Sequence, residues 1–91
     1  MSRIILDTTS CSTIDQLHEC LRRELGFPEH YGRNLDALWD CVTSWVELPV
    51  TIEWHGFAMA RSAIGEYVDR VLATLQEAGR EIGDVNVEVK D

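Results

Sequence analysis

The chain lacks any long apolar segment, and its first residues show no signal for export. Its longest apolar runs are a few residues, such as Ile4-Ile5-Leu6, whereas a membrane-spanning helix needs about 20. The N-terminus leads directly into a strand-like run without the apolar core of a signal peptide. Both absences predict a cytoplasmic protein that does not bind membranes.

The sequence also lacks the motifs of metal sites and of disulfide-rich proteins. The three cysteines form no Cys-x-x-Cys pair and are odd in number: they are Cys11, Cys20 and Cys41. They are interpreted as reduced thiols. The histidines have no spacing typical of zinc ligands: they are His18, His30 and His55. We therefore expect no metal and no cofactor.

Basic residues are half as frequent as acidic ones. The chain has 16 acidic and 8 basic residues, a net charge of −8, and Lys90 as its single lysine. A polyanion would repel such a domain, so direct binding to nucleic acid is disfavoured. Its field would instead attract basic partners. Composition alone also fits an acidity that only maintains solubility.

The length and pattern predict one α/β domain over residues 1–91. With 45% hydrophobic residues, the chain can bury a core. Three β-branched or alternating stretches are predicted strands: Arg3–Asp7, Val50–Trp54 and Val85–Val89. Helical patterns separate them, which favours a three-stranded parallel sheet packed against helices.

Three helices are predicted between these strands. The first begins after Thr13, which with Gln16 resembles a capping box, and ends at Gly26. The second begins after Asn34, and the third extends from about Gly65 to Ala78. The connector before the third helix has at most a short helical turn near residues 57–61.

On a helical wheel with about 100° of rotation per residue, the residues after Asn34 form two distinct faces. One broad arc is apolar: Leu35, Leu38, Trp39, Cys41, Val42, Trp45 and Val46. A narrow arc is polar: Asp36, Asp40, Thr43 and Glu47. We expect Cys41 to be a buried structural thiol and Trp45 and Trp54 to be core residues. His18 is expected on the polar side of the first helix or at its edge.

Asp36 and Asp40 form a like-charge pair one turn apart. Such a pair costs a few tenths of a kcal/mol in the free protein, and a partner's cation would relieve it. The alternatives are an ordinary solvated acidic face and a catalytic carboxylate pair. Catalysis is disfavoured because carboxylates on a convex helix surface lack the desolvation that shifts a pKa, so the chain is predicted not to be an enzyme.

These residues resemble a known family. Residues 29–47 read Glu-His-Tyr-Gly-Arg-Asn-Leu-Asp-Ala-Leu-Trp-Asp-Cys-Val-Thr-Ser-Trp-Val-Glu, followed by Pro49 and Glu53-Trp54. This segment closely resembles the barstar family, intracellular inhibitors of barnase-type, guanyl-preferring ribonucleases. The resemblance covers almost the whole chain, and the motif at residues 34–40 is very specific for this family. It implies a barstar-like α/β fold, an antitoxin or immunity role, and a one-to-one complex with a barnase-like ribonuclease, the free inhibitor being a monomer.

The resemblance also implies which residues bind the ribonuclease. Asp40 would occupy the site of the RNA phosphate, Asp36 would meet a neighbouring guanidinium, and Glu77 would pair with the basic rim. The surrounding contact surface would contain His30, Gly32, Asn34, Leu35, Trp39, Thr43 and Ser44. Carboxylates suit this task because an arginine binds carboxylate and phosphate alike.

Three positions depart from the family's pattern. His30 stands where barstar has a tyrosine that packs on the enzyme's catalytic histidine, Arg33 replaces a glutamate, and Ser44 replaces a glycine. These changes suggest a somewhat different cognate ribonuclease. The alternative function is a barstar-like module that neutralises or regulates another basic protein or toxin. The resemblance also implies a cis Leu48-Pro49 bond.

Overall fold

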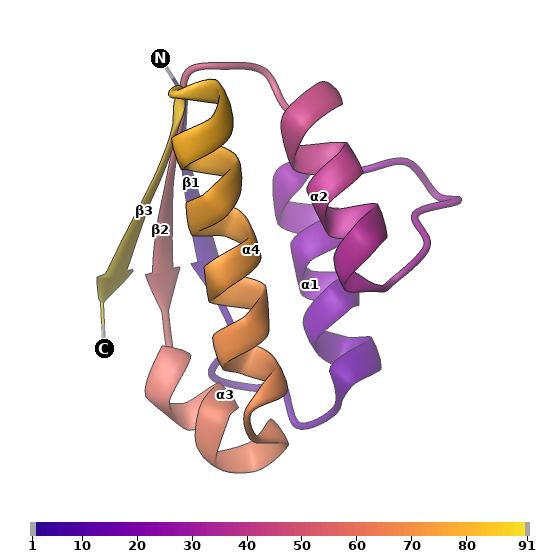
Figure 1. Ribbon diagram of the computed structural model, residues 1–91. Helices are drawn as coiled ribbons and strands as arrows, with labels where there is room; N and C mark the ends of the chain where they lie inside the picture. Colours follow the sequence, from indigo (N-terminus) through magenta and orange to yellow (C-terminus); the bar gives the residue numbers. More distant parts are fainter. Residues whose placement is uncertain (1, 91) are drawn as a thin grey trace.

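The computed structural model describes residues 2–90 as three strands and four helices (Figure 1). The strands are β1 (Ser2–Asp7), β2 (Val50–His55) and β3 (Val85–Lys90). The helices are α1 (Ile14–Leu25), α2 (Leu35–Ser44), α3 (Phe57–Ile64) and α4 (Tyr67–Ile82). The predicted α/β class with a three-stranded parallel sheet is confirmed.

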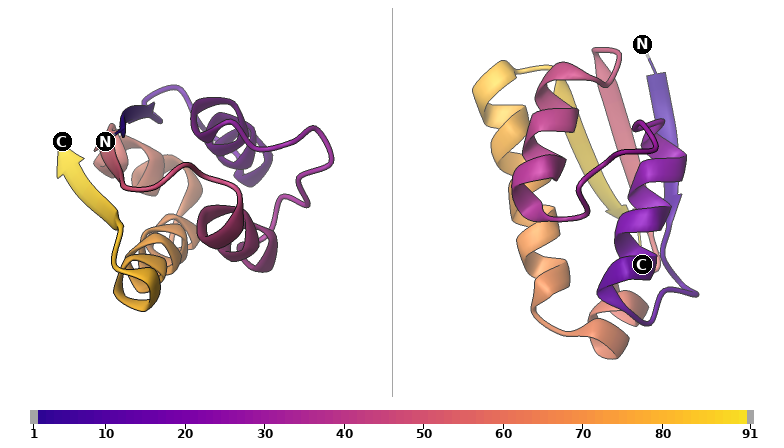
Figure 2. Two further views of the ribbon diagram at one scale, coloured as in Figure 1. Left: turned by 90° about the horizontal axis from the view of Figure 1, so that it is seen from above. Right: turned by 90° about the vertical axis from the view of Figure 1, so that its right-hand side faces the viewer.

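β2 is the central strand and pairs in parallel with β1 and β3. Its residues alternate between buried and half-buried, because α1 and α4 cover one face of the sheet, and α2 packs against α4 (Figures 1 and 2). The opposite face is polar, and Arg3 there donates to Glu53 at 2.7 Å and to Glu88 at 3.3 Å. The sheet therefore has one core face and one ion-paired face.

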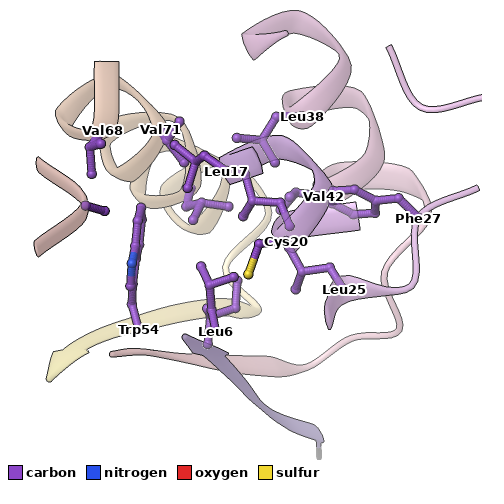
Figure 3. Close-up of a cluster of buried hydrophobic side chains, with 14 of the residues drawn as sticks. Leu6, Leu17, Cys20, Leu25, Phe27, Leu38, Val42, Trp54, Val68 and Val71 are labelled. Atoms are coloured by element: carbon purple, nitrogen blue, oxygen red, sulfur yellow. The ribbon is translucent and has the colours of Figure 1, made fainter. Parts of the chain in front are cut away.

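The core lies between the sheet and the helices (Figure 3). Leu6 and Trp54 extend from the sheet toward Leu17 of α1, Leu38 of α2 and Val71 of α4, and all five are fully buried. The prediction for Trp54 is confirmed. Its indole nitrogen donates to the buried Thr8 hydroxyl at 2.8 Å, so the polar atom it brings into the core is satisfied.

Local signals set the ends of α1 as predicted. The Gln16 amide donates to Thr13 Oγ1 at 3.1 Å, while the Gln16 side chain accepts from the Ser12 amide at 2.8 Å. The reciprocal bond of the capping box is therefore moved one residue upstream. Gly26 ends the helix at φ 73°, in the left-handed region that glycine tolerates best.

The second half of the chain is more helical than predicted. The expected short turn at residues 57–61 is a helix of 8 residues, α3. The next helix begins at Tyr67 rather than near Gly65, and it continues to Ile82 rather than ending at Ala78.

The Leu48-Pro49 bond is cis. It lies in the connection that takes the chain from α2 to β2.

Candidate functional site: the acidic face of helix α2

α2 presents its carboxylates to solvent because its apolar residues bind it to the core. Asn34 caps the helix as predicted, accepting from the Ala37 amide at 2.7 Å. Leu38 and Val42 are buried, whereas Asp36 and Asp40 are exposed. The predicted separation of apolar and acidic arcs is therefore present. Asp36 lies in the first turn, where the helix dipole favours a negative charge.

The C-terminal part of α2 differs from the prediction. The helix ends at Ser44, so Trp45 is its C-cap and Val46 and Glu47 lie beyond it. The expectation that Trp45 is a core residue is wrong, because 56% of it is exposed. Its indole nitrogen instead donates to the Gly26 carbonyl at 2.7 Å. Trp45 therefore connects the end of α2 to the end of α1.

The other predicted contact residues of α2 lie around the two carboxylates. Leu35 and Trp39 are half-buried against the core. The Thr43 hydroxyl donates to the Trp39 carbonyl at 2.8 Å, and the Ser44 hydroxyl donates to the Asp40 carbonyl. These bonds leave the hydroxyl oxygens able to accept from a partner.

Cys41 is only half-buried rather than fully buried as expected. Burial, followed by the charge of Asp40, raises the pKa of its thiol above the ordinary value. The thiol therefore stays protonated near neutral pH, which fits a structural role better than a nucleophilic one.

Residues 26–34, here called the docking loop, connect α1 to α2. Arg33, rather than the neighbouring Gly32, has positive φ in this part of the loop, at 54°. Gly32 serves a close approach instead: a Cβ at this position would lie 3.1 Å from the Ala37 Cβ. His30 is exposed. The loop thus carries His30, Gly32 and Asn34 beside the first turn of α2.

The docking loop is fixed to the core by a histidine that sequence reasoning placed wrongly. His18 is fully buried rather than on the polar side of α1. Its Nδ1 lies 2.7 Å from the Tyr31 hydroxyl of the loop, and its Nε2 lies 2.6 Å from the Tyr67 hydroxyl of α4. Burial lowers the pKa of His18 below its ordinary value. The spacing from Leu21 and Leu25 could have revealed this position, because His18 lies on the same buried helical face as these two residues.

The three predicted binding carboxylates have no cationic partner among the described residues. Among residues 2–90, Asp36, Asp40 and Glu77 have no ion pair within 4.0 Å. Glu77 is exposed on α4, the helix against which α2 packs. By contrast, Glu19 of α1 contacts two arginines, at 2.8 and 3.4 Å. The predicted binding carboxylates are therefore free to accept external cations.

The predicted binding residues are separate from a cavity beside α1. A cavity of about 230 Å³ lies between β1 and α1, lined by Asp7, Ser10, Cys11, Gln16, Glu19, Cys20 and Arg23. None of the predicted binding residues lines it.

Within residues 2–90, no three His, Cys, Asp or Glu side chains are grouped so as to hold a metal ion. No helix in this range has the length and apolarity needed to cross a membrane.

Comparison with known families shows which family the chain belongs to. The family model described as "Barstar (barnase inhibitor)" matches residues 1–90. The chain belongs to the barstar family. A protein of Bacillus subtilis (strain 168) named "Putative ribonuclease inhibitor YrdF" is 46% identical over 84 residues, which cover 92% of this chain and 92% of that protein. As a barstar family member, the chain is an inhibitor and not an enzyme.

Proposed function

We propose that this barstar family member inhibits a barnase-type, guanyl-preferring ribonuclease by placing the acidic face of α2 in the enzyme's active site. The observation that carries the proposal is the pair of exposed carboxylates, Asp36 and Asp40, which have no ion pair within residues 2–90. The family description and the ribonuclease inhibitor named in the similar Bacillus subtilis protein support the class of partner.

The carboxylates suit an active site that binds RNA phosphates. Such a site holds cations arranged to bind anionic oxygens, and an arginine can donate two parallel hydrogen bonds to a carboxylate as it does to a phosphate. Asp40 takes the place of the RNA phosphate in the enzyme's active site. Asp36 pairs with a neighbouring guanidinium of the enzyme, and Glu77 pairs with the basic residues at the rim of that active site. Because Leu38 and Val42 fix α2 to the core, little further ordering is needed on binding.

The rest of the contact surface surrounds these acids. His30, Gly32 and Asn34 come from the docking loop, and Leu35, Trp39, Thr43 and Ser44 come from α2. One inhibitor occupies one active site, so the complex is one-to-one. The inhibitor acts as an antitoxin in the cytoplasm and protects the producing cell from its own ribonuclease.

Titration of a guanyl-preferring ribonuclease with the purified protein tests the proposal. Activity should fall linearly and end at one equivalent of inhibitor. The Asp36→Ala variant should inhibit more weakly. Asp15→Ala is the matched control, because Asp15 is also exposed in the first turn of a helix and its removal changes the net charge equally.

Two results would contradict this function. The first is a lack of inhibition at a large excess of the wild-type protein over several ribonucleases of this class. The second is an equal loss of inhibition in both variants, which would show that only the total charge matters.

A further inference from the structure

One stretch of α1 contacts the docking loop at three points. His18 meets Tyr31, with 2.7 Å between Nδ1 and the hydroxyl. Glu19 accepts from the Arg33 guanidinium at 3.4 Å, and the Arg22 guanidinium lies 3.6 Å from the Glu29 carboxylate. The three α1 residues lie within about one helical turn, so a single rigid element contacts the middle of the loop and both sides of it.

Glu19 connects two of these contacts. Its Oε2 accepts from Nε of Arg22 at 2.8 Å, and its Oε1 accepts from Arg33. The four charges therefore alternate in sign from Glu29 through Arg22 and Glu19 to Arg33. A network of this kind holds geometry better than an isolated surface pair, because each side chain restrains its neighbour.

Arg33 shows that the loop is under constraint. Its φ of 54° lies in the left-handed region, which residues other than glycine rarely adopt. Such a conformation persists only where the surroundings enforce it. On one side Tyr31 is buried, and on the other side Asn34 caps α2. The contact with Glu19 then restrains the Arg33 side chain itself.

We propose that His18, Glu19 and Arg22 are positioning residues, which hold the docking loop in its binding conformation before the ribonuclease arrives. This inference rests on the proposed function. A partner pays no ordering entropy for a loop that is already fixed, so the three residues strengthen binding through the loop. If the loop opened in a fraction of molecules, affinity would fall by that fraction.

Glu19→Gln tests the charged part of this arrangement, because it keeps the side-chain shape and removes the charge that both arginines contact. Amide hydrogen exchange is measured in the free, full-length protein for the Tyr31 amide of the loop, which donates to the Pro28 carbonyl at 3.0 Å. We expect exchange to accelerate about two- to five-fold, as the loss of one or two surface ion pairs predicts. Arg33→Gln should have a similar effect, and the double variant should be little worse than either single one. Arg33→Lys should restore slow exchange in part.

Glu24→Gln is the matched control. Glu24 lies on the same helix and pairs with Arg23 at 3.2 Å, with no ion pair to the docking loop. It makes the same change in net charge, so it corrects for weaker attraction to a basic enzyme. The two variants are compared on a ribonuclease that the wild type inhibits. We expect the affinity of Glu19→Gln for this enzyme to be about two- to five-fold lower than the affinity of Glu24→Gln. Both variants should stay folded and should unfold at only slightly lower denaturant concentrations than wild type, because each loses surface ion pairs.

The outcomes separate this inference from the proposed function. Unchanged loop exchange in Glu19→Gln overturns the inference, even if the wild type is a strong inhibitor. Faster exchange with the same affinity as Glu24→Gln also overturns it. If the wild type inhibits no ribonuclease of this class, the proposed function fails, and the exchange measurement alone decides whether Glu19 fixes the loop.

Discussion

The Tyr31 hydroxyl and Nδ1 of His18 lie 2.7 Å apart in the interior of the protein. Tyr67 contacts the other ring nitrogen, so a neutral imidazole can donate to one hydroxyl and accept from the other. Protonation would make both nitrogens donors and would place a charge on a fully buried side chain. The folded protein therefore prefers the neutral form, and the pKa of His18 is lowered by burial.

This preference predicts a loss of stability in mild acid. A lowered pKa means that the unfolded chain binds the proton more readily, so His18 destabilises the fold as pH falls below about 6.5. For each unit by which the pH falls below this value while His18 stays neutral in the folded protein, the free energy of unfolding decreases by up to about 1.4 kcal/mol. Urea unfolding at pH 7.5 and at pH 5 measures this. His18→Gln, which can still donate and accept, should depend less on pH, and an equal dependence in both proteins would refute the prediction.

Asp40 should be the most important single side chain for inhibition. Asp40→Ala would leave several enzyme cations buried without their anion, and a truncation of this kind costs about 2 kcal/mol or more, roughly 30-fold in affinity. The helix should remain folded, because alanine is the better helix former and the Ser44 hydroxyl binds the Asp40 carbonyl rather than its side chain. Inhibition constants and circular dichroism check both points. Inhibition within a few-fold of wild type would contradict the phosphate-like role.

The net charge of −8 should make association depend on salt. We expect the association rate constant to fall about tenfold or more between about 0.01 M and about 1 M salt, because the screening length shrinks from about 30 Å to about 3 Å. The dissociation rate constant should change less, since contacts within the interface are shielded. Stopped-flow mixing measures both constants. An association rate that does not change with salt would argue against electrostatic steering.

His30 should influence how tightly the protein binds a barnase-like enzyme. It stands where barstar has a tyrosine that packs on the enzyme's catalytic histidine, and an imidazole ring buries less area in such a contact than a phenol ring does. His30→Tyr should therefore enlarge the stacked surface and strengthen binding to a barnase-like enzyme. Inhibition constants of the wild type and the variant measure the difference. Equal constants would place His30 outside the contact.

Much of the fold could be predicted from local patterns, and the errors have physical causes. Strand alternation and the caps at Thr13 and Asn34 are signals within a few residues, so elements and fold class followed from them. His18 was placed wrongly because its two tyrosine partners come from distant elements, and only their hydroxyls make its burial tolerable. Trp45 was placed wrongly because α2 ends at Ser44, where the helical wheel no longer applies.

The candidate site was less accessible to sequence reasoning than the fold. The exposure of Asp36 and Asp40 follows from helical periodicity, and the structure agrees with it. The contacts between α1 and the docking loop have no local signature, because Glu19 and Arg33 are 14 positions apart. The backbone of Arg33 could not be foreseen either, since glycine at the preceding position is the usual candidate for an unusual turn.

The hydrogen bond from the Trp45 indole to the Gly26 carbonyl joins two residues 19 positions apart. It brings together the two boundaries of the segment that contains the docking loop and α2, so this segment begins and ends at nearly the same place on the molecule. A segment with adjacent ends can be exchanged as one piece, provided that Leu38 and Val42 keep their places in the core. Barstar family members could therefore be recombined at these two boundaries, which would transfer partner preference while leaving the sheet and the other helices unaltered.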